Sequence, residues 1–164
     1  MNANESTFLE SIKLCFEEWK ALEIAIREGM GGRDAVAKRE WMAHVVFDYF
    51  KQYADTGKDE ICEYIAVIVD NEFDTCVQDG SLEYLAYMLC KYRDMCFSGQ
   101  HEEVRAIIDN KMRERLRNQT LSQISEVTDR MENVEINATS NDEVPIDHEQ
   151  NDGWTVVKRK GKRS

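Results

Sequence analysis

The residues that most often do chemistry in proteins are few in this sequence and lie far apart. None of the three histidines, His44, His101 and His148, has a cysteine or carboxylate at the spacing of a metal site or of a nucleophile and its base. The glycine-rich stretch 29–32 follows a predicted helix and lacks the Lys-Ser/Thr pair of a phosphate-binding loop, and no Gly-x-Ser-x-Gly motif is present. We therefore expect no catalytic residue, no metal and no cofactor, and we do not expect an enzyme.

The cysteines also argue against a metal or disulfide framework. Their number is odd, and no pair has the short spacing of a zinc knuckle. No export signal precedes them, which predicts reduced thiols in a cytosolic or nuclear protein. No stretch approaches the roughly 20 apolar residues of a membrane span.

Charge is the chemical property that stands out. The formal net charge is −11, but five basic residues lie in the last seven positions, so residues 1–157, with 16 basic and 32 acidic residues, carry −16. The basic residues of this tip are Lys158, Arg159, Lys160, Lys162 and Arg163. The rest of the chain would repel a phosphate backbone, so we expect a basic protein partner rather than a nucleic acid.

The acids are concentrated in residues 48–83, which hold ten acids and two bases. An ordinary solvated helix face would explain them. Like charges four positions apart destabilise a helix, however. Such pairs recur at Asp55, Asp59 and Glu63 and again at Asp70 and Asp74. We interpret this segment as a face that a cationic partner completes.

The elements that must position these acids are helices. A single proline and eight glycines in 164 residues favour helices over strands, and a hydrophobic content of 42% supports one core. We predict an all-α fold, a compact bundle of about five amphipathic helices over about 7–26, 34–53, 59–73, 82–97 and 101–125. A strand remains an alternative for residues 64–69, which are rich in β-branched side chains, but their helical spacing favours a helix.

The spacing also predicts which side chains face the core and where helices begin. Thr7 with Glu10, Asp59 and Ser81 are the predicted helix caps. The inward positions are Phe8, Ile12, Cys15, Trp19, Leu22 and Ile26; then Ala37, Trp41, Val45, Asp48 or Tyr49, and Gln52; then Ile61, Tyr64, Ile65, Val67, Ile68 and Glu72; then Leu82, Leu85, Met88 or Leu89, Tyr92 and Cys96; and finally Val104, Ile107, Ile108 and Met112.

Two tryptophans flank a glycine-rich break. Trp19 precedes Gly29-Met30-Gly31-Gly32, and Trp41 follows it. Glycine permits positive φ and close approach of backbones. We interpret the stretch as a corner between two helices, each carrying its tryptophan into a shared core, although any helical hairpin could show this pattern.

The ends of the chain differ from the body. Residues 1–6 are expected to fray. Residues 126–151 are rich in Asn, Ser, Thr, Asp and Glu and predict an acidic, disordered tether, so the helical domain spans 7–125. Residues 152–164 combine a short motif around Trp154 with the basic tip, which is either a nuclear-localisation element or a generic solvated end.

Several of these stretches resemble, in order, those of the pre-rRNA-processing escortin family, the Trp-Gly-Gly domain chaperones of small-subunit ribosomal protein S twenty-six. They are Trp19-Lys20-Ala21-Leu22-Glu23-Ile24-Ala25-Ile26 followed by Gly31-Gly32, Lys38-Arg39-Glu40-Trp41 with Val46-Phe47-Asp48-Tyr49-Phe50, Asn71-Glu72-Phe73-Asp74-Thr75 with Asp79-Gly80-Ser81-Leu82, and Asp152-Gly153-Trp154-Thr155-Val156-Val157-Lys158-Arg159-Lys160.

The resemblance implies an acidic helical chaperone that releases a newly imported, basic ribosomal protein from its import receptor, shields it and delivers it to pre-ribosomes. It implies a mainly nuclear protein, also cytoplasmic, that is a monomer or a 1:1 heterodimer with its cargo and needs no membrane. The partner-binding positions that it implies are Glu40, Trp41, Asp48, Asp70, Glu72, Asp74 and Asp79; Trp19, Gly31 and Gly32 are structural.

Alternatives remain at three points. Trp41 could equally be a core residue, and Glu72 or Asp74 could be a helix-end cap. Residues 126–149, with eight acids and one base, lack the nearly uninterrupted acidic run of some relatives. The resemblance therefore supports cargo binding by the domain more strongly than displacement of the import receptor by the tail. The second functional hypothesis is a nuclear adaptor that uses the Trp154 motif and the basic tip to recruit a processing factor or RNA.

Overall fold

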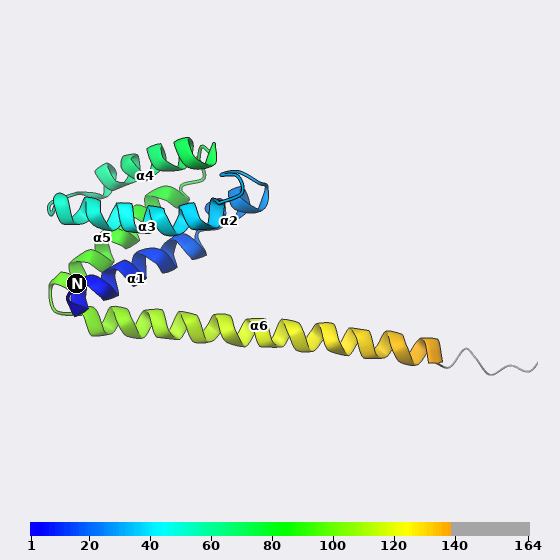
Figure 1. The fold of residues 1–164 in the computed structure, drawn as a ribbon. Helices are drawn as coiled ribbons and strands as arrows, with labels where there is room; N and C mark the ends of the chain where they lie inside the picture. The colour runs from blue at the N-terminus through cyan, green and yellow to red at the C-terminus, as the bar shows by residue number, and fades with distance from the viewer. Residues whose placement is uncertain (139–164) are drawn as a thin grey trace, which may run out of the picture. The chain divides into compact units, whose positions relative to one another are not determined.

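The computed structural model describes residues 1–138, with side chains described up to residue 125. This part of the chain contains no strand and six helices: α1 (Ala3–Glu18), α2 (Lys20–Arg27), α3 (Ala35–Gln52), α4 (Lys58–Phe73), α5 (Ser81–Phe97) and α6 (His101–Ala138) (Figure 1). The predicted all-α fold is confirmed, including a helix rather than a strand at 64–69. The Trp154 motif and the basic tip, from Lys158 to Arg163, lie outside the described residues.

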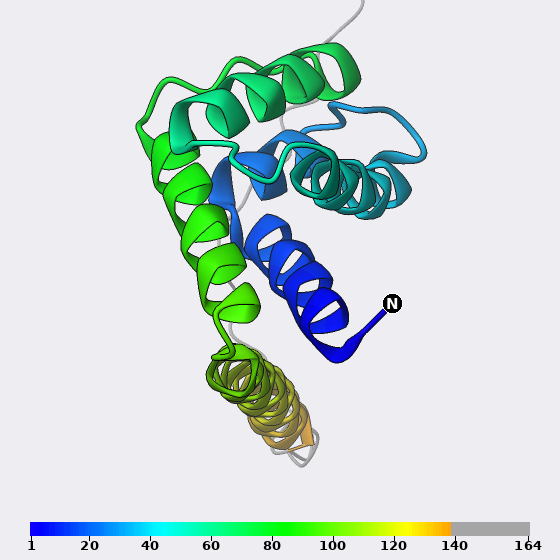
Figure 2. The ribbon, with the colours of Figure 1, turned by 90° about the vertical axis from the view of Figure 1, so that its left-hand side faces the viewer.

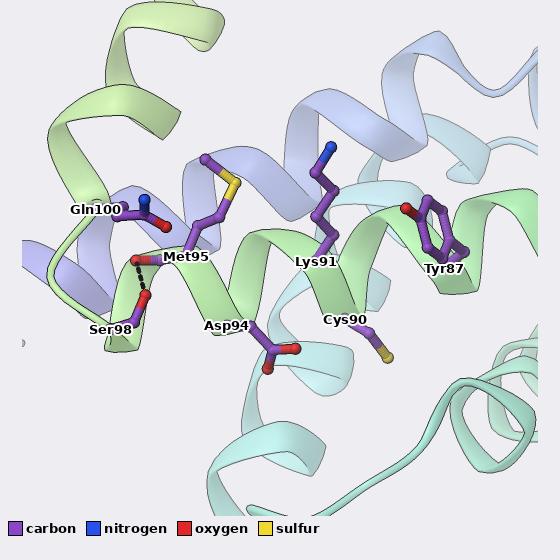
Figure 3. Close-up of a pocket in the computed structure, with 7 residues that line it drawn as sticks. All are labelled: Tyr87, Cys90, Lys91, Asp94, Met95, Ser98 and Gln100. Carbon is purple, nitrogen blue, oxygen red and sulfur yellow. Dashed lines mark hydrogen bonds between the residues drawn. The ribbon is translucent and has the colours of Figure 1, made fainter.

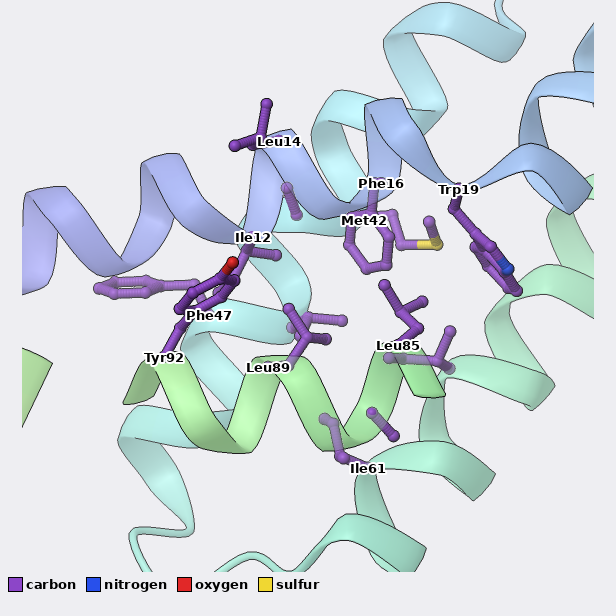
Figure 4. Close-up of a cluster of buried hydrophobic side chains, with 14 of the residues drawn as sticks. Ile12, Leu14, Phe16, Trp19, Met42, Phe47, Ile61, Leu85, Leu89 and Tyr92 are labelled. Carbon is purple, nitrogen blue, oxygen red and sulfur yellow. The ribbon is translucent and has the colours of Figure 1, made fainter. Parts of the chain in front are cut away.

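Residues 1–118 form one compact unit, and the part of α6 from Gln119 onward belongs to a second. Within the first unit α1 packs between α3 and α5, while α4 packs against α5 and α3 (Figure 2). Phe16, Met42 and Leu89 meet in the core between these helices (Figure 4). Val104 and Ile108, near the start of α6, are buried in the same cluster. No helix of the described part is apolar and long enough to cross a membrane.

The chain begins in ordered helix rather than in a frayed segment. Asn2 caps α1, because its side chain accepts a hydrogen bond from the Glu5 backbone N–H at 2.9 Å and the Glu5 carboxylate accepts one from the Asn2 N–H at 3.1 Å. The predicted capping pair, Thr7 with Glu10, is wrong. Thr7 is buried inside the helix, and the same capping pattern occurs five positions earlier.

The first predicted helix is two helices. Trp19 has an extended backbone, with φ −73° and ψ 104°, and separates α1 from α2. The inward positions Phe8, Ile12, Trp19 and Leu22 are buried as predicted. The break therefore interrupts the helix while these four side chains stay in the core.

Helix α3 has the predicted span but buries a different face. Its buried residues are Ala35, Met42, Ala43, Val46, Phe47 and Phe50. Ala37, Trp41, Asp48 and Gln52, which we predicted to face inward, are exposed, and Trp41 is 48% exposed. Two apolar stripes run along this helix, and the packing of α1 selects the other one. Trp41 therefore does not join Trp19 in a shared core.

Two predicted caps are also wrong. Gly57 is the N-cap of α4, and the Glu60 carboxylate accepts a hydrogen bond from its N–H at 3.0 Å, so Asp59 lies inside the helix. Gly80 is the N-cap of α5, and Ser81 is the first helical residue. The inward stripe of α5 is confirmed, with Met88 only partly buried, whereas Val67 of α4 is 58% exposed.

Helix α6 is longer than predicted. It begins at His101, as expected, but continues to Ala138 instead of fading near residue 125, so the first part of the predicted tether is helical. Ion pairs tie the first part of α6 to α1: Lys111 pairs with Glu18, and Arg115 pairs with Glu17.

Candidate protein-binding site

The predicted partner-binding side chains lie on three consecutive elements. Glu40, Trp41 and Asp48 belong to α3, Asp70 and Glu72 belong to α4, and Asp74 and Asp79 belong to the loop between α4 and α5. Glu72 is half-buried, and the other six are exposed. The structure therefore presents these side chains to solvent, but it does not gather them at one point.

Helices α3 and α4 meet along an antiparallel seam that is fixed at two points. At one end, Lys38 Nζ lies 3.0 Å from Glu72 Oε2 and donates to the Glu72 carbonyl at 3.2 Å. At the other end, the rings of Tyr49 and Tyr64 stack with their centroids 4.1 Å apart. We call the surface between these two contacts the α3–α4 seam.

Trp41 and Asp48 belong to this seam. Trp41 follows Lys38 by three positions, so both side chains lie on the same side of α3. Asp48 directly precedes Tyr49 on α3. Burial raises the pKa of the Tyr64 hydroxyl, and the negative charges of Tyr49 and Asp48 raise that pKa further. The seam therefore carries a large exposed indole and a carboxylate within two turns of one helix.

Three of the predicted acids have structural roles. Glu72 is held by Lys38. Asp74 ends α4 in the left-handed conformation, with φ 45°. Asp79 Oδ1 accepts a hydrogen bond from the Ser81 N–H at 2.9 Å, and its hydrogen bonds to Ser81 lower the pKa of the Asp79 carboxyl. Glu72 and Asp74 thus lie at the end of α4, and Asp74 is its C-cap. This agrees with the alternative that one of these two residues caps a helix end.

The residues around the glycine corner contact the same region of the chain. Trp19 Nε1 donates a hydrogen bond of 2.8 Å to Ser81 Oγ. Gly31 has φ +81°, and a Cβ there would lie 2.7 Å from Cδ1 of Phe73. Together with the pair between Lys38 and Glu72, these contacts fix residues 19–38 against residues 72–81.

Gly32 differs from Gly31. It also has positive φ, +73°, but a Cβ there would meet nothing within 4 Å. Close packing therefore requires glycine at position 31, whereas only the backbone conformation favours it at position 32.

Sequence reasoning missed three contributors to this region. Ser81 was interpreted as a cap, Lys38 was given no role, and the Tyr49–Tyr64 stack was not foreseen. Ser81 and Lys38 both lie inside stretches that carry the family resemblance. Their place in these stretches was the one indication in the sequence that Ser81 and Lys38 have a role. A single sequence does not show which side chains contact each other.

The surface of α5 offers a contrasting hollow of about 430 Å³ (Figure 3). Tyr87, Cys90 and Met95 line it together with the oppositely charged Lys91 and Asp94. Because both signs of charge are present, it has no preference for a charged partner. Among the described residues, no three His, Cys, Asp or Glu side chains converge as metal ligands.

The fold and the site define a class of protein: an all-helical domain with an acidic surface that exposes a tryptophan. The family model described as "Pre-rRNA-processing protein TSR2", or WGG, matches residues 8–87. A zebrafish (Danio rerio) TSR2 homolog is 36% identical over 63% of this chain and 58% of its own length, and a human homolog is 29% identical over 93% and 94%.

The fold is also similar to that of a solved relative. An NMR solution structure of yeast TSR2 matches with a TM-score of 0.58 at 25% identity, over 69% of this chain and 74% of that one. The chain spans only 58% and 53% of the zebrafish and Xenopus laevis relatives. The chain belongs to the TSR2 family, whose members carry the name pre-rRNA-processing proteins.

Proposed function

We propose that this protein acts in pre-rRNA processing and small-subunit maturation as an acidic chaperone. It binds a newly imported, basic small-subunit ribosomal protein, of the S twenty-six family, helps to release it from its import receptor, shields it and delivers it to pre-ribosomes. The name shared by the relatives supports the processing role. The cargo and its delivery follow from the family resemblance and from the charge of the chain.

The observation that carries this proposal is the α3–α4 seam. A ribosomal protein has a cationic surface that binds rRNA phosphates, and the acids of this domain offer comparable negative charge. The exposed indole of Trp41 adds a face for an arginine or lysine side chain, an interaction worth about 0.5–1 kcal/mol at an exposed site. Electrostatic complementarity gives fast, salt-sensitive capture, which rRNA can then outcompete.

The pair between Lys38 and Glu72 gives the seam acids different roles. Glu72 is already neutralised by Lys38, so it has less to offer a cationic partner than Asp48. We therefore propose that Trp41 and Asp48 contribute most to cargo binding. The negative electrostatic potential that attracts the cargo also includes contributions from Glu40, Asp70, Asp74 and Asp79. A mainly nuclear location, with a cytoplasmic fraction, is part of the same proposal.

The proposal can be tested by titrating the purified ribosomal protein into the full chain and into the variants Trp41→Ala and Asp48→Asn. Both variants are expected to bind several-fold more weakly at unchanged melting temperature. Tyr87→Ala and Asp109→Asn are matched controls, because these side chains are exposed on other helices. Equal affinity for all five proteins would remove the seam from the binding mechanism.

The adaptor hypothesis is tested by deleting residues 152–164. A chaperone whose binding surface lies in residues 1–118 keeps its cargo after this deletion. If the shortened chain loses the ribosomal protein but retains its fold, the C-terminal motif is the binding element and the adaptor is the better account.

A further inference from the structure

A second hollow lies beside the loop that joins α4 to α5. It measures about 350 Å³ and is lined on one side by Ala66, Val67, Val69 and Asp70 of α4 and on the other by Thr75, Cys76, Val77 and Leu82. Most of its lining is aliphatic. Val67, which is 58% exposed, stands at its edge.

The charge around this hollow has one sign. Residues 59–90 contain eight acids and no lysine, arginine or histidine. One of these acids, Asp70, lines the hollow itself. Asp70 is in none of the ion pairs found among the described side chains, in contrast to Glu72, which is paired with Lys38. A mainly aliphatic hollow with the carboxylate of Asp70 in its lining suits a ligand that is both aliphatic and cationic.

The packing around the loop keeps the hollow in place. Thr75 Oγ1 donates to the Phe73 carbonyl at 2.7 Å, and Asp79 Oδ1 accepts a hydrogen bond from the Ser81 N–H at the start of α5. Phe73 in turn packs against Gly31, and Ser81 accepts the hydrogen bond from Trp19. The glycine corner thus fixes both ends of the loop, so the hollow is formed before any partner arrives.

We propose that this hollow is a second contact site for the cargo, distinct from the α3–α4 seam. It takes an aliphatic side chain from a basic segment of the ribosomal protein, while a neighbouring lysine or arginine of that segment pairs with Asp70. This inference rests on the proposed function and adds a source of specificity to it. Charge attracts any basic protein, whereas an apolar pocket selects a segment with an aliphatic residue at the right place.

The test uses a substitution that adds negative charge while it removes apolar surface. Val67→Asp in the full chain should weaken binding of the purified ribosomal protein at least fivefold, because the aliphatic contact is lost. Val36→Asp is the matched control, since Val36 is also 58% exposed but lies at the start of α3. This control should bind as tightly as the unmodified chain, or more tightly.

The outcomes separate this inference from the proposed function. If the unmodified chain does not bind the ribosomal protein, the proposed function fails. If it binds, and Val67→Asp binds as tightly as Val36→Asp, attraction by charge alone is sufficient and the second contact site is wrong.

A measurement on the unmodified chain covers the case in which Val67→Asp does not fold. Cys76 lines the hollow and is exposed, whereas Cys62 and Cys90 are partly buried elsewhere. Saturating ribosomal protein should slow alkylation of Cys76 at least fivefold and leave Cys62 and Cys90 unchanged. An unchanged rate at Cys76 in the saturated complex would overturn the proposal.

Discussion

The indole nitrogen of Trp19 donates a hydrogen bond of 2.8 Å to Ser81 Oγ, across 62 positions of the chain. Trp19 is only 5% exposed and stands at the break between α1 and α2, while Ser81 is the first residue of α5. This bond therefore joins the corner near the N-terminus to the loop that carries Asp74 and Asp79. Together with the contact between Gly31 and Phe73, it connects the glycine corner to both ends of this acidic loop.

Replacing Ser81 by alanine should destabilise the domain by about 1–3 kcal/mol, because the buried indole N–H of Trp19 would lose its acceptor. Urea unfolding followed by tryptophan fluorescence measures the change. Ser98→Ala is the control, since Ser98 is exposed and bonds only to the Met95 carbonyl of its own helix end. Equal stability of the two variants would mean that the bond contributes nothing to folding.

Valine at position 31 should destabilise the domain more than valine at position 32. Both glycines have positive φ, which β-branched residues rarely adopt, but only position 31 would also place its Cβ 2.7 Å from the Phe73 ring. Overpacking of this kind typically adds about 1–3 kcal/mol. Thermal unfolding of the two variants gives the order. A normal melting temperature combined with lost cargo binding would move the corner into the binding site.

The pair between Lys38 and Glu72 should contribute at most about 1 kcal/mol, because both side chains are about 35% exposed and solvent screens them. Lys38→Glu alone should lower the melting temperature slightly, since it sets two carboxylates against each other. Combining it with Glu72→Lys should restore the original value. Failure of the double substitution to recover stability would show that the Lys38 hydrogen bond to the Glu72 carbonyl matters more than the charge pair.

The cysteines should react with iodoacetamide in an order set by burial. Burial raises the pKa of the Cys15 thiol to about 12, with a further contribution from Glu18, and burial raises that of Cys96 to about 11. Since the thiolate is the reactive form, these two residues should be alkylated last at pH 8, and the exposed Cys76 first. Mass spectrometry of peptides from timed samples gives the order, and early labelling of Cys15 in the folded protein would contradict it.

The raised pKa values also predict alkaline sensitivity. In the unfolded chain a cysteine ionises near its usual pKa of about 8.5, whereas Cys15 in the folded chain keeps its proton to about 12. The stability linked to this thiol is therefore complete below the unfolded pKa and is lost as pH rises above it. Cys15→Ala should have a flatter stability profile between pH 8 and pH 10 than the original chain, as measured by urea unfolding. Parallel profiles would exclude Cys15 as the cause.

The parts of the fold that could be predicted from sequence are those where apolar residues occupy one face only. On α5 the positions Leu82, Leu85, Leu89, Tyr92 and Cys96 offer one stripe, and they are buried. On α3 the residues from Trp41 to Phe50 are apolar on two sides, and periodicity alone selected the side that holds Trp41. The packing of neighbouring helices, which is a tertiary property, decides between two such stripes.

The caps and the site show the same limit. Asn2 with Glu5 and Thr7 with Glu10 share one sequence pattern, and only the structure shows that the first pair caps α1. Asp70, Asp74 and Asp79 could be recognised as acids near one loop, but their roles differ because Asp74 and Asp79 have backbone tasks. The sequence left Trp41 equally as a core residue or a contact residue, and only the structure shows that it is exposed.

The most direct test of the central claim is the dissociation constant of the full chain for purified ribosomal protein S twenty-six, measured by calorimetry at several salt concentrations. We expect a 1:1 complex at low salt whose affinity falls steeply as salt rises, because opposite charges on the two proteins are screened. Absence of a complex at low salt, or an affinity that does not change with salt, would contradict the account.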